Sequence, residues 1–215
     1  MTVRRKQNNW PEALMLMPDS GDCLHVRTRG VVGNRIRSVT GAQHDHDAIF
    51  CKDGDELFIY NERWPHSHLD PAKEYLQSIL KKGGDFVITR PSWVFDEEIR
   101  QTRTDVDLEK WRASINVWCK AMEGNYYPLR NLWYVYKKNR RWARWVPGKP
   151  NEKAYFCSAA VRRIFLENDE YPWAPDHVLT ERLAAPIHWA RAILYGHMKI
   201  IAHTGDLNER IVRVS

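Results

Sequence analysis

The chain has four cysteines, each of which could supply a nucleophilic thiol. Cys157 stands before three small residues and opens a stretch with apolar residues at helical spacing. A thiol at the start of a helix lies at the positive end of the helix dipole, which favours the thiolate and lowers the thiol pKa. Cys157 is therefore the candidate nucleophile, with a buried structural cysteine as the alternative interpretation. We expect Cys23 and Cys51, in strands, and Cys119, within a helix, to be structural.

His46 is the candidate general base, since a nucleophilic cysteine needs a base and that base needs a residue to orient it. Two β-prone runs flank Asp53-Gly54 and predict a β-hairpin. If Asp53-Gly54 form a two-residue turn, Asn61 lies opposite His46 and can hold the imidazole. If the turn is longer and bulged, Glu62 takes that place. The residues alone leave the orienting position open between Asn61 and Glu62.

Histidines at a regular spacing offer a second chemistry. His44 and His46 fall on one face of the predicted strand, and His66 and His68 repeat the spacing after the hairpin. Four imidazoles can bind zinc. The stretch around His44 partly matches the HxHxDH ligand motif of metallo-β-lactamase-type hydrolases, but Ala48 stands where that motif needs Asp. A zinc-dependent hydrolase using the His44/His46 cluster is thus a further alternative, while we expect His66 and His68 to be loop residues.

The segments that must position these residues alternate between strands and helices, which predicts a mixed α+β fold with an antiparallel sheet packed against helices. The strands are expected at 23–26, 48–51, 57–60, 85–90 and 210–214. The helices are expected at 71–80, 105–122, 156–167 and 184–197, with Asp107 as the N-cap of the second.

Length and composition are those of one globular domain: 215 residues, of which 43% are hydrophobic and 28% charged. No run approaches the roughly 18 apolar residues that a membrane helix needs. Basic residues near the N-terminus are not followed by an apolar segment, which argues against a secretory signal. We therefore expect a cytoplasmic product, released by lysis or incorporated into a virion if it leaves the cell. Residues 1–19 are predicted to be an N-terminal extension and residues 20–215 a single domain.

The formal net charge is +6, and the densest basic stretch is also rich in tryptophan. This insert, at about 133–150, can present a basic aromatic face to an anionic or glycan partner, nucleic acid included. A solvated loop with tryptophans packed into the core is the alternative. The face consists of Arg140, Arg141, Trp142, Arg144 and Trp145.

Several short motifs follow one another in a recognisable order. They are Gly21-Asp22, His46 to Phe50, Tyr60-Asn61-Glu62, Val87 to Pro91, Tyr126-Tyr127, and Tyr155 to Val161. In this order they resemble the circularly permuted papain-like superfamily, in its YiiX-like branch of NlpC-type amidases and peptidases. The resemblance spans about residues 20–180, whereas the insert at 133–145 has no counterpart in the family pattern.

The resemblance implies a permuted papain-like fold and an acyl-transfer mechanism. Cys157 would be the nucleophile and His46 the general base. In that branch the third residue is commonly Glu, which favours Glu62, but papain-like enzymes also orient the histidine with an amide, as Asn61 could. The implied substrates are peptidoglycan stem peptides, other amides and lipid acyl groups, and no cofactor is implied. Some members have no established activity, so a non-catalytic binding or structural protein, for example in a virion, is the alternative function.

Overall fold

The computed structural model describes residues 18–63, 65–95, 108–126, 157–167 and 186–211. Its strands are β1 (Cys23–Arg27), β2 (His46–Asp53), β3 (Glu56–Glu62), β4 (Ser67–Pro71), β5 (Asp85–Pro91) and β6 (Met198–His203). Its helices are α2 (Val31–Thr40), α3 (Ala72–Lys81), α5 (Leu108–Met122), α7 (Cys157–Glu167), α8 (Pro186–Leu194) and α9 (Leu207–Ile211), with the short helical turn η1 (Ser92–Val94) after β5.

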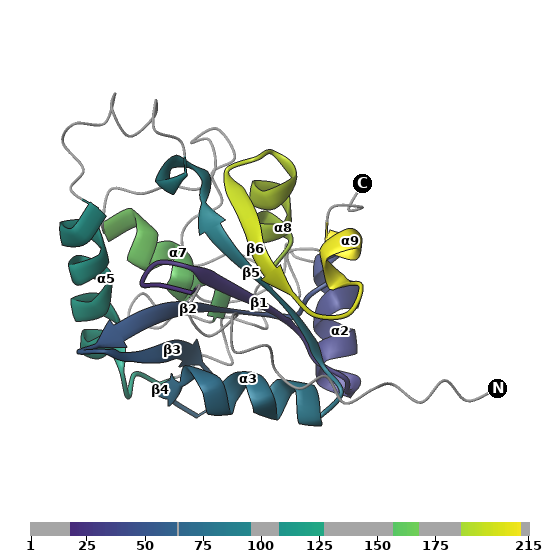
Figure 1. The fold of residues 1–215 in the computed structure, drawn as a ribbon. Coiled ribbons are helices and arrows are strands. Elements are labelled where there is room, and N and C mark those ends of the chain that lie inside the picture. Colours follow the sequence, from purple (N-terminus) through teal and green to yellow (C-terminus); the bar gives the residue numbers. More distant parts are fainter. Residues whose placement is uncertain (1–17, 64, 96–107, 127–156, 168–185, 212–215) are drawn as a thin grey trace, which may run out of the picture.

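The strands form one six-stranded sheet in the order β4-β3-β2-β1-β5-β6, and every neighbouring pair is antiparallel. The expected α+β class with an antiparallel sheet is therefore confirmed. Figure 1 shows α3 on one side of this sheet and α5, α7 and α8 on the other. Among the described residues no helix is long and apolar enough to cross a bilayer.

Each face of the sheet buries its own apolar core, because successive side chains of a strand point to opposite faces. On β2, Ile49 and Cys51 join the core that α5, α7, α8 and α9 cover. Ala48 and Phe50 join the second core, which α3 covers. The same alternation sends Asp47 toward α7 and its neighbour His46 toward the α3 face.

The predicted hairpin is present, but its turn lies one residue further along the chain. Asp53 pairs with Glu56, so the turn residues are Gly54-Asp55, and Gly54 adopts the left-handed conformation with φ 60°. Glycine tolerates this φ without the steric cost that a side chain would add. Relative to the predicted turn the pairing shifts by two residues, and a shift of two leaves every side chain on its face.

Two local expectations were wrong. The strand predicted at 210–214 begins inside α9, where Leu207 and Ile211 lie four residues apart and are both buried. The edge position beside β5 is taken instead by β6. His68 is not a loop residue, because it lies in β4 opposite Asn61, and His66 forms an isolated bridge with Tyr126.

The expected helices at 71–80, 105–122 and 156–167 are confirmed within the described ranges by α3, α5 and α7, whereas α8 confirms the fourth but ends at Leu194, three residues before the expected end. Several predictions fall outside those ranges. They are most of the N-terminal extension (1–17), the Asp107 cap, the motif residues Tyr127 and Tyr155, and the basic aromatic insert at 133–150.

Candidate active site

Cys157 is the first residue of α7, as the sequence predicts, and its side chain is almost fully buried. The backbone N–H of Asp47 is near enough to its sulfur to favour the thiolate. The Ser158 hydroxyl oxygen lies 3.9 Å from the same sulfur. Because Asp47 directly follows His46 in β2, the thiol lies beside the start of the strand that carries the candidate base.

The expected lowering of the thiol pKa does not occur. The pKa of Cys157 is raised to about 12, first by burial and then by the negative charge of Asp47. Hydrogen bonds from the backbone N–H groups of Asp47 and Ser158 act in the opposite direction but do not compensate. Desolvation thus raises the thiol pKa more than the helix start lowers it, and Cys157 is a neutral thiol at physiological pH.

His46 is held by a chain of hydrogen bonds that runs through β3 to β4. Its Nε2 lies 2.5 Å from Oδ1 of Asn61. The amide nitrogen of Asn61 donates to Oδ2 of Asp70 at 3.1 Å, and Arg63 Nη2 donates to the other oxygen of Asp70 at 2.9 Å. Because the Asn61 amide nitrogen donates to Asp70, Asn61 Oδ1 faces His46 and accepts a hydrogen bond from its Nε2–H. This tautomer leaves Nδ1 of His46 unprotonated and able to take a proton.

Tyr75 of α3 is a buried phenol near the candidate base. Burial is the largest cause of its raised pKa, followed by the charge of Asp70; the charge of Cys157 also raises it, whereas a hydrogen bond with Asn61 lowers it. Among the described residues His46 contacts Asn61, whereas the Cys157 sulfur lies near the Ser158 hydroxyl at the start of α7.

Glu62 points away from His46, toward the opposite face of the sheet. Its carboxylate accepts a hydrogen bond from the Tyr60 hydroxyl, and its Oε2 has no hydrogen-bond partner among the described residues. Burial raises the pKa of Glu62 to about 7, while the Tyr60 hydrogen bond and the charge of His46 lower it. Of the two sequence candidates for the orienting position, Asn61 is the one that contacts the imidazole.

The predicted His44/His46 pair does not form. His44 precedes β2, so the alternation of a strand does not apply to it, and its Nε2 lies 2.8 Å from Asp47 Oδ1 in the interior. His46 projects to the other face and contacts Asn61. A zinc site built on these two imidazoles is therefore excluded by their positions. Nothing in the local pattern indicates that His44 contacts His25 of β1, 5.0 Å away between ring centroids.

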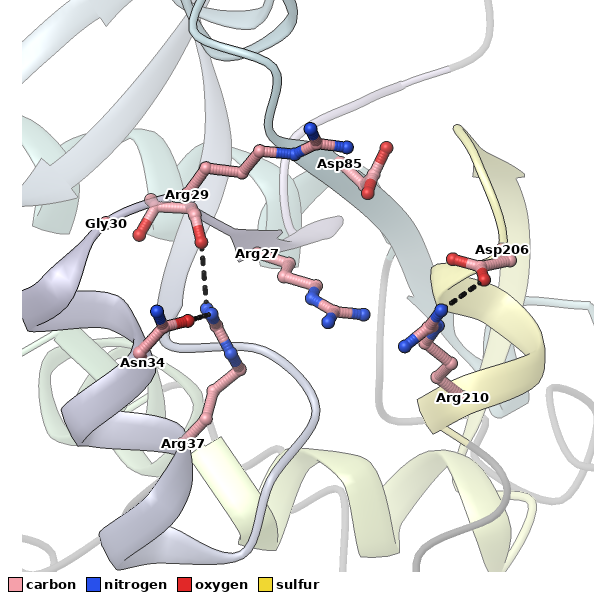
Figure 2. Close-up of a pocket in the computed structure, with 9 residues that line it drawn as sticks. Arg27, Arg29, Gly30, Asn34, Arg37, Asp85, Asp206 and Arg210 are labelled. Atoms are coloured by element: carbon pink, nitrogen blue, oxygen red, sulfur yellow. Dashed lines mark hydrogen bonds and ion pairs between the residues drawn. The ribbon is translucent and has the colours of Figure 1, made fainter. Parts of the chain in front are cut away.

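A basic cavity of about 390 Å³ opens at the end of the sheet where β2 begins. Arg27 lies on its wall and follows Val26, the residue that pairs with His46. Figure 2 shows the guanidinium of Arg27 directed toward Arg210 and Asp206. The lining consists of Arg27, Thr28, Arg29, Gly30, Asn34, Arg37, Asp85, Asp206 and Arg210. Four arginines against two aspartates make the cavity cationic.

Sequence reasoning did not find several residues of these sites: Asp70, Tyr75, His25 and Asp47. Asp70 reaches Asn61 only because β4 pairs with β3, and the β4 strand was not predicted. Tyr75 lies in a predicted helix, but no pattern specifies which side of the sheet that helix covers.

No protein-family model matches the chain, and no curated protein matches it. Among solved structures the chain is similar to a protein described as the metalloprotein YiiX from Escherichia coli O157:H7. The two share 13% identity with a TM-score of 0.48. The match covers 70% of this chain and 66%, just under two thirds, of that protein. This is a weak likeness of fold, and the function has to be argued from the side chains of this chain.

Proposed function

We propose that this chain is a cysteine hydrolase of the amidase or peptidase type, with residues 20–215 forming one permuted papain-like domain. Cys157 is the nucleophile, His46 the general base, and Asn61, in preference to Glu62, the residue that orients the base. The observation that carries the proposal is the contact between His46 Nε2 and Asn61 Oδ1. It supports a strand histidine in the tautomer that can accept a proton, and the proposal pairs this base with the thiol at the start of α7.

The raised pKa of Cys157 determines the order of events. A resting thiolate–imidazolium pair does not form, so the proton leaves Sγ for Nδ1 of His46 as the sulfur attacks the substrate carbonyl. The C–S bond forms, the C–N bond of the amide breaks, and the imidazolium of His46 protonates the departing amine. Water activated by His46 then hydrolyses the thioester and releases the acid. In this proposal the N–H groups at the start of α7 stabilise the oxyanion.

The substrate class is an amide, peptide or acyl group, with peptidoglycan stem peptides as the first compounds to test. This choice rests on the resemblance of the motifs rather than on the shape of the site. No cofactor takes part in the proposed reaction.

The test is acetylation of the purified chain by p-nitrophenyl acetate, followed by peptide mass spectrometry. We expect the acetyl group on Cys157, and a rate lower by about 100-fold or more in His46→Ala, because general base catalysis has that magnitude. His203→Ala is the matched control, since His203 is exposed on the edge strand β6. Equal acetylation of Cys157 in His46→Ala and wild type would overturn the proposal.

The cationic cavity supports a second candidate, a binding protein for an anionic partner. Burial lowers the pKa of Arg27 most, followed by the positive charges of Arg210 and Arg37, whereas Asp206 and Asp85 act in the opposite direction. Arg27 therefore lies within electrostatic range of two other guanidiniums. An anion would relieve this repulsion. Isothermal titration with inorganic phosphate should show binding that weakens with salt and is lost in Arg27→Ala but retained in Arg191→Ala, an exposed arginine of α8. Binding that is insensitive to Arg27→Ala would exclude this candidate.

A further inference from the structure

Three fully buried side chains that the proposed reaction does not use lie close together on the face of the sheet that α7 covers. His25 comes from β1, Asp47 from β2, and His44 from the segment that precedes β2. All three are 0% exposed. Each offers one ligand atom, and these atoms all lie within 4.8 Å of one another. Two imidazoles and one carboxylate are a common protein ligand set for zinc.

Both imidazoles are directed at the same carboxylate oxygen. His25 Nδ1 lies 2.7 Å from Asp47 Oδ1, and His44 Nε2 lies 2.8 Å from it. The second contact has the distance of a hydrogen bond but not its angles, so neither nitrogen of His44 has a hydrogen-bond partner among the described residues. A buried polar group without a partner is costly, and an imidazole in this state requires an explanation.

The atoms of His25 and Asp47 that face away from the cluster form hydrogen bonds with neighbouring side chains, as is usual for metal ligands. His25 Nε2 lies 2.8 Å from the Thr89 hydroxyl oxygen of β5. When Nε2 donates its proton to Thr89, Nδ1 of His25 is the lone-pair nitrogen and faces the cluster. Asp47 Oδ2 accepts a hydrogen bond from the Ser158 hydroxyl of α7, which leaves Oδ1 for the cluster. Such second hydrogen bonds fix the tautomer and the orientation of metal ligands.

We propose that His25 Nδ1, His44 Nε2 and Asp47 Oδ1 bind a divalent transition metal ion, with zinc as the best match to this donor set. Contacts of 2.7 and 2.8 Å would have to open to about 3.3–3.6 Å, the separation of ligand atoms around a tetrahedral ion with bonds of about 2.0–2.2 Å. The ion would give His44 Nε2 a coordinate bond in place of a contact that lacks hydrogen-bond geometry. Three protein ligands leave the fourth tetrahedral position to a water molecule, and the site would join β1, β2 and the start of α7 independently of any hydrolysis.

The test uses the full chain, stripped with a chelator and titrated with Zn²⁺ and Co²⁺. We expect one metal ion per chain by elemental analysis, a visible absorption band of tetrahedral Co²⁺, and a higher melting temperature with zinc. His44→Ala should abolish all three signals. Thr89→Val, which keeps the side-chain shape and removes only the hydroxyl next to His25, should weaken zinc binding about 10- to 100-fold in a folded chain.

His46→Ala is the matched control, because His46 is two residues from His44 but points to the opposite face. It should retain full zinc binding while it loses acetylation of Cys157, so the two proposals fail independently. A network of shared protons in place of a metal predicts no bound ion and no thermal shift with zinc. That result, or equal zinc affinity in wild type and His44→Ala, would overturn the inference.

Discussion

Arg90 forms a bidentate ion pair with Asp22 through two hydrogen bonds, from Nε to Oδ1 and from Nη2 to Oδ2, each 2.7 Å long. Asp22 leads into β1 and Arg90 lies near the end of β5, next to the paired residues Cys23 and Thr89. Two motifs far apart in the sequence, Gly-Asp before a strand and Arg-Pro at the end of another, therefore meet in one ion pair. It fixes the strand ends beside Thr89, whose hydroxyl contacts His25.

Breaking this ion pair should be costly, because Asp22 is almost completely buried. Burial raises the pKa of Asp22, and the hydrogen bonds from Arg90 offset that only in part. We expect Arg90→Met to lower the free energy of unfolding by about 3 kcal/mol, since it leaves a buried carboxylate unpaired. Adding Asp22→Asn to that variant should recover part of the loss. Urea unfolding of both single variants and the double variant measures the coupling, and strictly additive losses would contradict it.

Asn61 should act on the reaction through the tautomer of His46. Asn61→Ala removes the acceptor of the Nε2 proton, and we expect acetylation of Cys157 to slow about 10-fold or more. Asn61→Asp places a negative charge beside the imidazole and stabilises the imidazolium, so the acidic limb of the pH–rate profile should move to higher pH. Asn208→Ala, on α9, is the control. An unchanged pH profile in Asn61→Asp would show that Asn61 has only a structural role.

Cys157 should alkylate as a thiol and not as a preformed thiolate. Its pKa is raised to about 12, whereas a cysteine in an unfolded chain titrates near ~8.5. The rate of iodoacetamide labelling at Cys157 should therefore keep rising with pH beyond 9 in the folded protein, while the urea-unfolded chain reaches its plateau. Peptide mass spectrometry measures both rates. Fast labelling of folded Cys157 below pH 7 would contradict the expected neutral thiol.

Glu62 should make the protein less stable as the pH rises. Its pKa is raised to about 7 in the folded state from an ordinary value of 4.5, because burial disfavours the carboxylate. The stabilisation is complete below pH 4.5 and is lost as the pH rises through 7, by roughly 3 kcal/mol at most. Glu62→Gln keeps an acceptor for Tyr60 and should remove this dependence, whereas the exposed Glu56→Gln should not. Chemical denaturation at pH 5 and pH 8 compares the three proteins.

Gly21 should tolerate no side chain. It has φ 92°, and a Cβ there would lie 2.2 Å from the ring of Trp111 and 2.9 Å from Ile115. Gly41 also has a positive φ, 73°, but a Cβ at that position would meet nothing within 4 Å. Gly21→Ala should therefore destabilise the fold by about 1–3 kcal/mol more than Gly41→Ala, which isolates the steric part of the cost. Equal melting temperatures of the two variants would contradict this packing.

Strong local signals predicted the parts of the fold that carry the proposed reaction. Alternating β-prone residues around Gly54 predicted the hairpin and placed Asn61 on the face of His46, even though the turn was placed one residue too early. That inference remained correct because the register error was two residues, and a shift of two keeps each side chain on the same face of the sheet. Apolar residues at helical spacing likewise predicted α7 with Cys157 at its start.

The remaining elements lack such signals. In α2 the only buried residue is Gly33, and Val31 and Val32 are largely exposed, so the helix has no apolar stripe that a pattern could reveal. In α9 five residues are too few to separate a period of two from contacts four residues apart. The His25, His44 and Asp47 cluster depends on the pairing of β1 with β2, a long-range register that no local spacing encodes.

Neighbouring positions of β2 serve different sites, His46 on one face and Asp47 on the other. Insertion or deletion of a single residue anywhere between His46 and Phe50 would shift the alternation of side chains between the two faces of the sheet by one residue. It would move the His46 imidazole to the α7 face or the Asp47 carboxylate to the α3 face, unless the downstream core residues exchanged faces instead. Within the β2–β3 hairpin, length variation among related chains should therefore be confined to the Gly54-Asp55 turn. The strand β2 itself should evolve by substitution alone.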